Sequence, residues 1–197
     1  MKINYQTKLD ELTDSLTYKP SLLLHSCCGP CSSYVTEYLA KYFDIYLFFF
    51  NPNIYPESEY IKRLDTQSEW LDKTNYARLI GGNYDHMSFL NAVKGLENEP
   101  EGGGRCTKCF ILRLEETARL ASLGGYDYFG TTLTVSPHKN AELINNLGEG
   151  LADKYNVKWL PSDFKKREGY KRSIELSREY ELYRQNYCGC EFSLRKD

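Results

Sequence analysis

The sequence predicts an α/β protein in which a mostly parallel sheet lies between two layers of helices. Short apolar runs alternate with amphipathic helical segments along the chain, as in repeated strand–helix units. The run at 44–50 stays apolar after its first residue, which is typical of a strand covered on both faces. Because crossovers between parallel strands are right-handed, this pattern predicts a Rossmann-like three-layer architecture. At 197 residues we expect one domain, 1–197, with a core over about 20–160 and a helical C-terminal extension over about 161–197.

The first part of the chain supplies three of the expected strands. SLLLH at 21–25 is a short apolar run, and SSYVTEYLAKY at 32–42 has its apolar residues at helical spacing. After the strand at 44–50, the prolines of NPNIYP break the chain before a long helical pattern at 57–74. YARLI at 76–80 predicts the third strand.

The remaining segments continue the alternation of strand and helix. Two glycines end the strongest helical pattern, and Pro137 is suited to the first position of a later helix. The glycine-rich stretch 97–105 lacks the pattern of a phosphate-binding loop, so we interpret it as a mobile loop. The expected elements are helices at 86–96, 106–125, 136–156 and 167–185 and strands at 126–134 and 157–160.

Composition and charge narrow the class of protein. The chain is 41% hydrophobic and 26% charged, and it has no apolar run long enough to cross a bilayer, so we expect no membrane partner. Its first residues are polar and acidic, unlike a secretory signal, which predicts a cytoplasmic protein. The net charge of −2 argues against binding nucleic acid through overall charge alone.

One stretch of the chain is strongly basic. KKREGYKR at 165–172 holds five cations against one carboxylate, and such a patch on an acidic body can attract a polyanion. The alternative is a solvated charged turn followed by the start of a helix. The candidate residues for binding a polyanion are Lys165, Lys166, Tyr170, Lys171 and Arg172.

The seven cysteines fall into three groups, at 27–31, 106–109 and 188–190. In a reducing compartment such clusters indicate metal ligands or redox catalysts rather than structural disulfides. Structural cysteines are usually buried singly and scattered along the sequence. The first group directly follows the first expected strand, where the active sites of parallel sheets lie.

The first cysteine group contains CGPC, which has the spacing of a thioredoxin-like dithiol. The helix expected after it would lower the pKa of a thiol. However, Cys27 stands where thioredoxins have tryptophan, and four further cysteines would stay unexplained. A thiol–disulfide oxidoreductase that uses Cys28 and Cys31 is therefore kept as an alternative.

CTKC places Cys106 and Cys109 three residues apart at the start of a helix, so that both sulfurs lie on one side. With Cys27 and Cys28 they would supply four thiolates from two segments. Four thiolates suit a structural zinc ion or a 4Fe–4S cluster equally well by count. Zinc usually binds two Cys-x-x-Cys pairs, which Cys28 with Cys31 and Cys106 with Cys109 would supply, whereas adjacent cysteines are less usual for it. The spacing therefore leaves the metal open and favours the cluster.

YCGC near the C-terminus brings two sulfurs close across a single glycine. A disulfide between Cys188 and Cys190 would be strained and easily reduced, as a catalytic electron relay requires. The alternative interpretation is a second pair of metal ligands.

With these residues in place, the chain resembles the QueH-type epoxyqueuosine reductases, a cobalamin-independent family that completes queuosine biosynthesis in tRNA. The resemblance covers about residues 21–193 and rests on several blocks in one order. Gly29 stands where alanine is more frequent in the family. The matching blocks are LLHSCCGPCSSYV, FFFNPNIYPESEYIKR, RCTKCFILRLEETARLA, FGTTLTVSPHKN and SDFKKREGYKRSIELSREYELYRQNYCGCEFS.

The resemblance implies a fold of the adenine-nucleotide-hydrolase kind, a 4Fe–4S cluster and a redox-active cysteine pair. By position, the cluster ligands would be Cys27, Cys28, Cys106 and Cys109, and the redox disulfide would join Cys188 and Cys190. Cys31 is then spare, unless it or a carboxylate replaces one thiolate and leaves an iron open. An additional iron is also compatible with the resemblance.

The implied reaction converts the epoxide of epoxyqueuosine in tRNA to the cyclopentene of queuosine, with two electrons from an unidentified donor. The modified base would leave the anticodon stack to reach the site, and Tyr170 or Tyr187 could stack on it. Two alternatives stay open. One is a zinc-binding RNA module without redox activity, and the other is the thiol–disulfide oxidoreductase described above.

Overall fold

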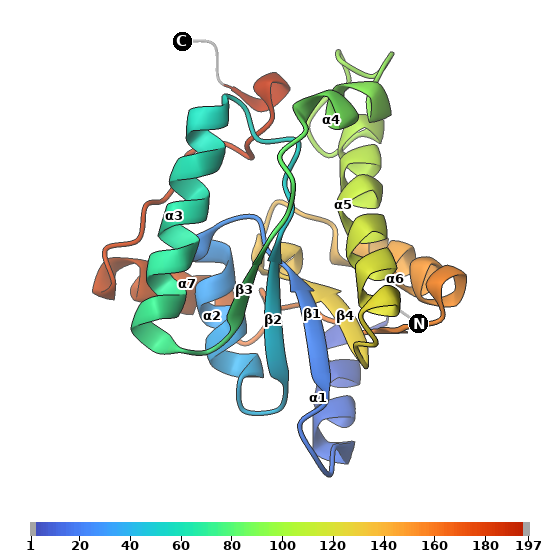
Figure 1. Cartoon of the computed structure of the whole chain (residues 1–197), viewed down its shortest axis with the longest axis vertical. Helices are drawn as coiled ribbons and strands as arrows, with labels where there is room; N and C mark the ends of the chain where they lie inside the picture. The colour runs from blue at the N-terminus through green and yellow to red at the C-terminus, as the bar shows by residue number, and fades with distance from the viewer. Residues whose placement is uncertain (1–2, 195–197) are drawn as a thin grey trace.

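A computed structural model describes residues 3–194 of the chain. These residues form a five-stranded sheet in which all neighbouring strands are parallel, in the order β3-β2-β1-β4-β5 (Figure 1). The α/β class and the parallel sheet predicted from the sequence are confirmed. The strands are β1 (Ser21–His25), β2 (Asp44–Phe49), β3 (Arg78–Gly81), β4 (Tyr128–Thr131) and β5 (Lys158–Trp159).

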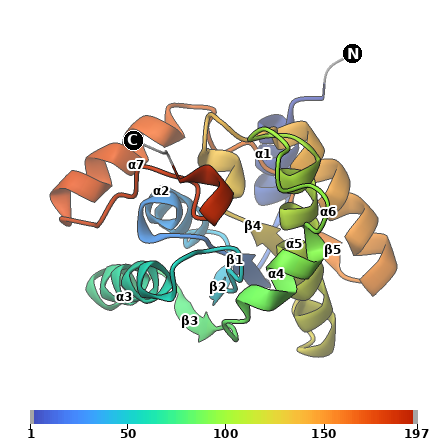
Figure 2. The same cartoon turned by 90° about the horizontal axis from the view of Figure 1, so that it is seen from above.

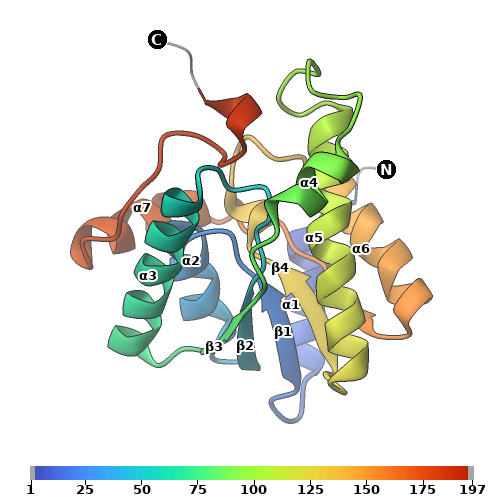
Figure 3. The same cartoon turned by 45° about the horizontal axis from the view of Figure 1, so that its top comes forward.

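Helices cover both faces of the sheet, which gives the predicted three layers. Helices α2, α3 and α7 lie on one side of the sheet, and α5 and α6 lie on the other (Figure 3). The helices are α1 (Tyr5–Ser15), α2 (Gly29–Leu39), α3 (Glu57–Thr74), α4 (His86–Ala92), α5 (Gly104–Leu123), α6 (Ala141–Tyr155) and α7 (Gly169–Glu179), with short 3-10 helices η1 (Leu133–Val135) and η2 (Glu191–Ser193).

The central strand β1 divides the core between the two faces. Leu22 and Leu24 belong to the apolar cluster that contains Val35 of α2, whereas Leu23 belongs to the cluster that contains Leu114 of α5. This alternation follows from the pleat of a strand, and it requires both faces to be covered. The buried β1 therefore ends inside the protein, directly before the first cysteines.

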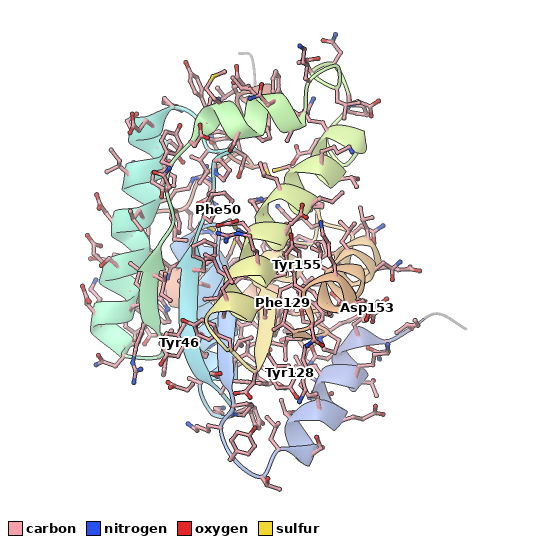
Figure 4. All side chains as sticks on the ribbon, turned by 45° about the vertical axis from the view of Figure 1, so that its right-hand side comes forward. Tyr46, Phe50, Tyr128, Phe129, Asp153 and Tyr155 are labelled. Atoms are coloured by element: carbon pink, nitrogen blue, oxygen red, sulfur yellow. The ribbon has the colours of Figure 1, made fainter. Side chains whose placement is uncertain are left out.

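The side of the molecule seen in Figure 4 carries helices α5 and α6 over strand β4. Phe129 of β4 is fully buried and packs against Trp159 of β5, with 5.0 Å between ring centroids. Tyr155 at the end of α6 donates a hydrogen bond of 3.0 Å to Glu115 of α5. These contacts fix the position of α5, whose first turn carries two of the cysteines.

Several element boundaries differ from the sequence prediction. The last helix was predicted over 167–185, but α7 ends at Glu179, because Glu181 takes a positive φ of 54°. Tyr180 packs edge-on against Trp70 there, with centroids 4.9 Å apart. The predicted helix at 136–156 begins only at Ala141, since the Asn140 side chain accepts the Leu143 amide hydrogen bond at 3.1 Å and caps it.

Strand β4 is also shorter than predicted, and helix α1 was not predicted. The chain leaves β4 at Thr131, whose hydroxyl accepts a hydrogen bond from the Leu133 amide at 3.2 Å as η1 begins. In α1 the inward-facing positions include Tyr5 and Leu9, and its remaining residues are mostly polar. Within residues 3–194, none of the helices has both the length and the apolar character needed to span a bilayer.

We expect Gly148→Ala to lower the free energy of unfolding by roughly 1–3 kcal/mol, because the core has no space for a methyl group there. A Cβ at Gly148 would lie 2.3 Å from the Trp159 ring. That ring cannot easily move, since its Nε1 donates a hydrogen bond of 3.0 Å to Asn145. Urea denaturation measures the change.

Gly150→Ala is the matched control, because it makes the same substitution on the same helix where nothing lies within 4 Å of the new Cβ. We expect it to be neutral or to stabilise the protein by up to about 1 kcal/mol through helix propensity. Equal destabilisation by both substitutions would contradict the packing argument.

Candidate metal and redox site

The first cysteine group lies at the carboxyl end of the sheet, between β1 and α2. Figure 2 looks onto this end, and there the C-terminal segment lies across the sheet. Cys27, Cys28 and Cys31 place their sulfurs within 4.8 Å of one another, and 3.8 Å separates the first two. Cys28 is the N-cap of α2, and its sulfur accepts a hydrogen bond from the Cys31 amide at 3.4 Å. These three thiols therefore form a compact, largely buried set of potential metal ligands.

The three thiols differ in pKa. Hydrogen bonds with Cys28 and Cys31 hold the pKa of Cys27 well below its usual range, although burial opposes them. Burial and the hydrogen bond with Cys27 raise the pKa of Cys28 to about 12. Hydrogen bonds to its two neighbours, with burial, also raise the pKa of Cys31. Cys27 is thus the most acidic of the three thiols, and a cation bound by all three would displace their protons.

The second cysteine pair comes from the first turns of α5, on the other face of the sheet. The sulfur of Cys106 accepts a hydrogen bond from the Gly102 amide at 3.2 Å, and it packs against the apolar cluster that contains Cys27 and Cys28. Cys109 is 7% exposed, and burial raises its pKa to about 12. Thiols from both faces of the sheet therefore lie at its carboxyl end.

The third pair, Cys188 and Cys190, follows α7 on the C-terminal segment that crosses the carboxyl end of the sheet. Cys190 is buried in a small apolar cluster with Cys109, Phe89 and Val93. The sulfur of Cys188 lies 3.8 Å from Nζ of Lys139. Both cysteines of the pair are free thiols, and with Cys106 and Cys109 they line one small cavity. The pair is therefore placed beside the α5 thiols.

Arg113 of α5 provides a positive charge among these sulfurs. The side chain is 1% exposed, and Nε donates a hydrogen bond of 3.2 Å to the Cys109 carbonyl. Among the described residues, Nη2 has no hydrogen-bond partner and no carboxylate forms an ion pair with the guanidinium. Burial alone would lower the pKa of Arg113, but Cys109 and Cys188 raise it overall.

A buried guanidinium without an anionic partner is costly. A metal centre held by several thiolates is such an anion, and the thiols around Arg113 are soft ligands of the type that iron–sulfur clusters and zinc require. The residues present therefore fit a thiolate-bound metal centre, and Arg113 would balance its charge.

A cavity of about 600 Å³ opens beside the sulfurs. Its lining includes Cys27, Cys31 and Cys188 together with Tyr170 and Tyr187. Lys139 also lines the cavity; burial lowers its pKa, but the neighbouring thiols of Cys188 and Cys27 raise it overall, so it stays a cation. The cavity thus combines reactive sulfur, a positive charge and aromatic surfaces.

The predicted basic patch is largely paired with acidic side chains. Lys165 lies 2.7 Å from Asp163, Lys171 lies 3.2 Å from Glu168, and Arg172 lies 2.7 Å from Glu37 of α2. Lys166 is exposed and lies with Lys165 beside a separate groove. Of the five predicted tRNA-binding residues, Tyr170 is the one that lines the sulfur cavity.

Sequence reasoning missed Arg113 and Lys139, and it left Cys31 outside the ligand set. The position of Arg113, four residues after Cys109 on the same helix face, was a usable signal. Lys139 gave none, because a lysine in a turn is normally solvent-exposed.

Proteins of a known family are similar to this chain over most of its length. The family model described as "Epoxyqueuosine reductase QueH" matches residues 22–196. An epoxyqueuosine reductase QueH of Staphylococcus epidermidis is 47% identical, over 99% of this chain and 86% of its own length. That of Streptococcus pyogenes is 45% identical, over 98% and 79% of the two chains, and that of Thermotoga maritima is 39% identical, over 88% and 90%. The predicted resemblance is confirmed: the chain belongs to the epoxyqueuosine reductase QueH family.

Proposed function

We propose that this protein reduces epoxyqueuosine in tRNA to queuosine, removing the epoxide oxygen as water. Membership of the family supports the substrate. The observation that carries the proposal is that three cysteine groups surround the carboxyl end of the sheet, beside a cavity of about 600 Å³. Ligands of open parallel sheets bind at the carboxyl ends of the strands.

The proposed cofactor is a 4Fe–4S cluster held by Cys27, Cys28, Cys106 and Cys109. Cys27 and Cys28 directly precede α2, and Cys106 and Cys109 lie in the first turns of α5, so the proposed cluster would join the two faces of the sheet. When bound, such a cluster supplies single electrons and, at an iron with an open position, a Lewis acid. The buried charge of Arg113 supports an anionic group at this place.

Cys188 and Cys190 are the proposed redox pair. Oxidation of two thiols to a disulfide releases two electrons and two protons, which is what converting an epoxide to an alkene and water consumes. An external thiol or low-potential electron carrier then returns the disulfide to the dithiol.

The proposed tRNA contacts divide into two sets. Tyr170 and Tyr187 line the cavity and offer stacking surfaces for a base turned out of the anticodon loop. The cations of the 165–172 stretch lie outside it and would contact phosphates. Because most of them are paired with carboxylates, we expect each to contribute modestly.

Replacing Lys166 and Lys171 by glutamine is expected to weaken tRNA binding and to flatten its salt dependence by at most about two units of slope. Both side chains are exposed. Filter binding at several salt concentrations measures this. The same double substitution at the exposed Lys154 and Lys158 is the control. An equal effect of both pairs would remove the basic stretch from the interface.

The direct test of the proposed function uses anaerobically purified protein, a chemical reductant and tRNA that carries epoxyqueuosine. Mass spectrometry of the digested nucleosides should show the loss of one oxygen atom from the modified base. Unchanged epoxyqueuosine with a fully metal-loaded protein would contradict the proposal.

One observation favours the zinc alternative. The 3.8 Å between the sulfurs of Cys27 and Cys28 matches two thiolates on one tetrahedral ion with metal–sulfur bonds of about 2.3 Å. The visible spectrum of the anaerobic protein decides between the two centres. Brown protein that contains iron and sulfide supports the cluster, whereas colourless protein with stoichiometric zinc supports the zinc site.

A further inference from the structure

The segment that carries Cys188 and Cys190 is held by a buried arginine of another helix. This segment follows α7 and belongs to no strand, so hydrogen bonds from elsewhere must hold its backbone. Arg63 of α3 donates from Nη1 to the Cys188 carbonyl at 3.1 Å and from Nη2 to the Tyr187 carbonyl at 3.5 Å. The side chain is 1% exposed, so water does not compete for these contacts.

The guanidinium of Arg63 is itself fixed. Its Nε donates to Glu59, one turn earlier on α3, at 2.7 Å, and the Tyr183 hydroxyl donates to the same carboxylate at 3.0 Å. Burial lowers the pKa of Arg63, but Cys28 and Glu59 raise it overall, so the group stays charged. A planar donor held in this way defines the positions of two successive carbonyl groups.

Gly189, the residue between the two cysteines, is constrained by the same arginine. Gly189 has a φ of 131°, and a Cβ there would lie 2.9 Å from Nη1 of Arg63. Both the backbone conformation and the close approach of the guanidinium therefore require glycine. On the other side, the Gly189 carbonyl accepts a hydrogen bond from the Tyr55 amide at 2.9 Å.

Cys188 is thus held at two points. Arg63 binds its carbonyl, and Lys139 lies beside its sulfur at 3.8 Å, at the wall of the large cavity. We propose that Arg63 is a positioning residue for the redox pair, which fixes the backbone of Cys188 so that its sulfur faces the substrate cavity. This inference rests on the proposed function, in which Cys188 and Cys190 supply electrons.

Arg63→Lys tests the proposal, because lysine keeps the charge but cannot bind two carbonyls and Glu59 at once. We expect kcat to fall on the order of 10–100-fold, since a displacement of about 1 Å costs that much, while KM for tRNA changes less than about twofold. The metal content should be unchanged. The dithiol–disulfide equilibrium of Cys188 and Cys190 against glutathione should shift, and a merely structural residue would not move it.

Arg119→Lys is the matched control, since Arg119 makes an exposed ion pair with Glu116 on α5. It should retain wild-type kcat and thiol equilibrium. If Arg63→Lys does not fold, Gly189→Ala disturbs the same contact from its other partner and is expected to give the same changes.

The two proposals fail in distinguishable ways. If Cys188→Ser retains full activity, the redox role of the pair is wrong, whatever Arg63→Lys does. If Cys188→Ser is inactive but Arg63→Lys and Gly189→Ala keep wild-type kcat and thiol equilibrium, the positioning role alone is wrong.

Discussion

Cys106→Ala is expected to lose both the visible absorbance of a bound cluster and all turnover, whereas Cys31→Ala is expected to keep the absorbance. In the proposed ligand set, Cys106 is one of four thiolates and Cys31 is spare. Both side chains are partly exposed and neither belongs to the fully buried core, so neither substitution should unfold the protein. Iron and sulfide analysis with the visible spectrum of each anaerobic variant gives the measurement.

The opposite result has a definite meaning, because the structure groups Cys31 with Cys27 and Cys28 within 4.8 Å. If Cys31→Ala loses the metal and Cys106→Ala keeps it, then a three-sulfur centre replaces the proposed four-sulfur cluster. Zinc content measured on the same samples would show which metal such a centre holds.

Cys188→Ser is expected to keep the absorbance of the metal centre and to lose turnover by at least about 100-fold, because serine cannot supply electrons by forming a disulfide. The Cys188 sulfur lies at the cavity wall, 3.8 Å from Nζ of Lys139, so removing it should lower kcat far more than it changes tRNA affinity. Single-turnover assays with excess enzyme and a chemical reductant provide the measurement.

Cys190→Ser sharpens this experiment. Cys190 is buried beside Cys109 and does not line the large cavity. We expect Cys190→Ser to be as inactive as Cys188→Ser if the two act as a pair. An unchanged rate in either variant with chemical reductant would remove the dithiol from the reaction.

The sheet was predictable because its strands are short apolar runs between clear breaks in the pattern. Helix α1 was not predicted, because its buried positions alternate with polar residues and its apolar stripe is short. The last helix was predicted too long, since 180–185 has helix-favouring composition. In the folded chain, Glu181 has a positive φ and Leu182 packs into the core after it. Tertiary packing decides where the helix ends.

The thiols of the candidate site were predictable from their clustering, but the cations around them were not. Glu59 and Arg63 have the spacing of an exposed ion pair on a helix, and burial converts them into an anchor for a distant segment. Arg113 shares a helix face with Cys109 in the sequence, but its burial does not follow from that position. Which charged residues are buried depends on how α3, α5 and the C-terminal segment meet in three dimensions.

The crossing of the C-terminal segment over the carboxyl end of the sheet also determines when the proposed metal site can form. Cys27 and Cys28 leave the ribosome early, but Cys188 and Cys190, which line the site with the α5 thiols, are synthesised near the end of the chain. The enclosed site therefore exists only after translation has passed residue 190. Nascent chains should expose the early thiols to oxidants and to competing metals until that point.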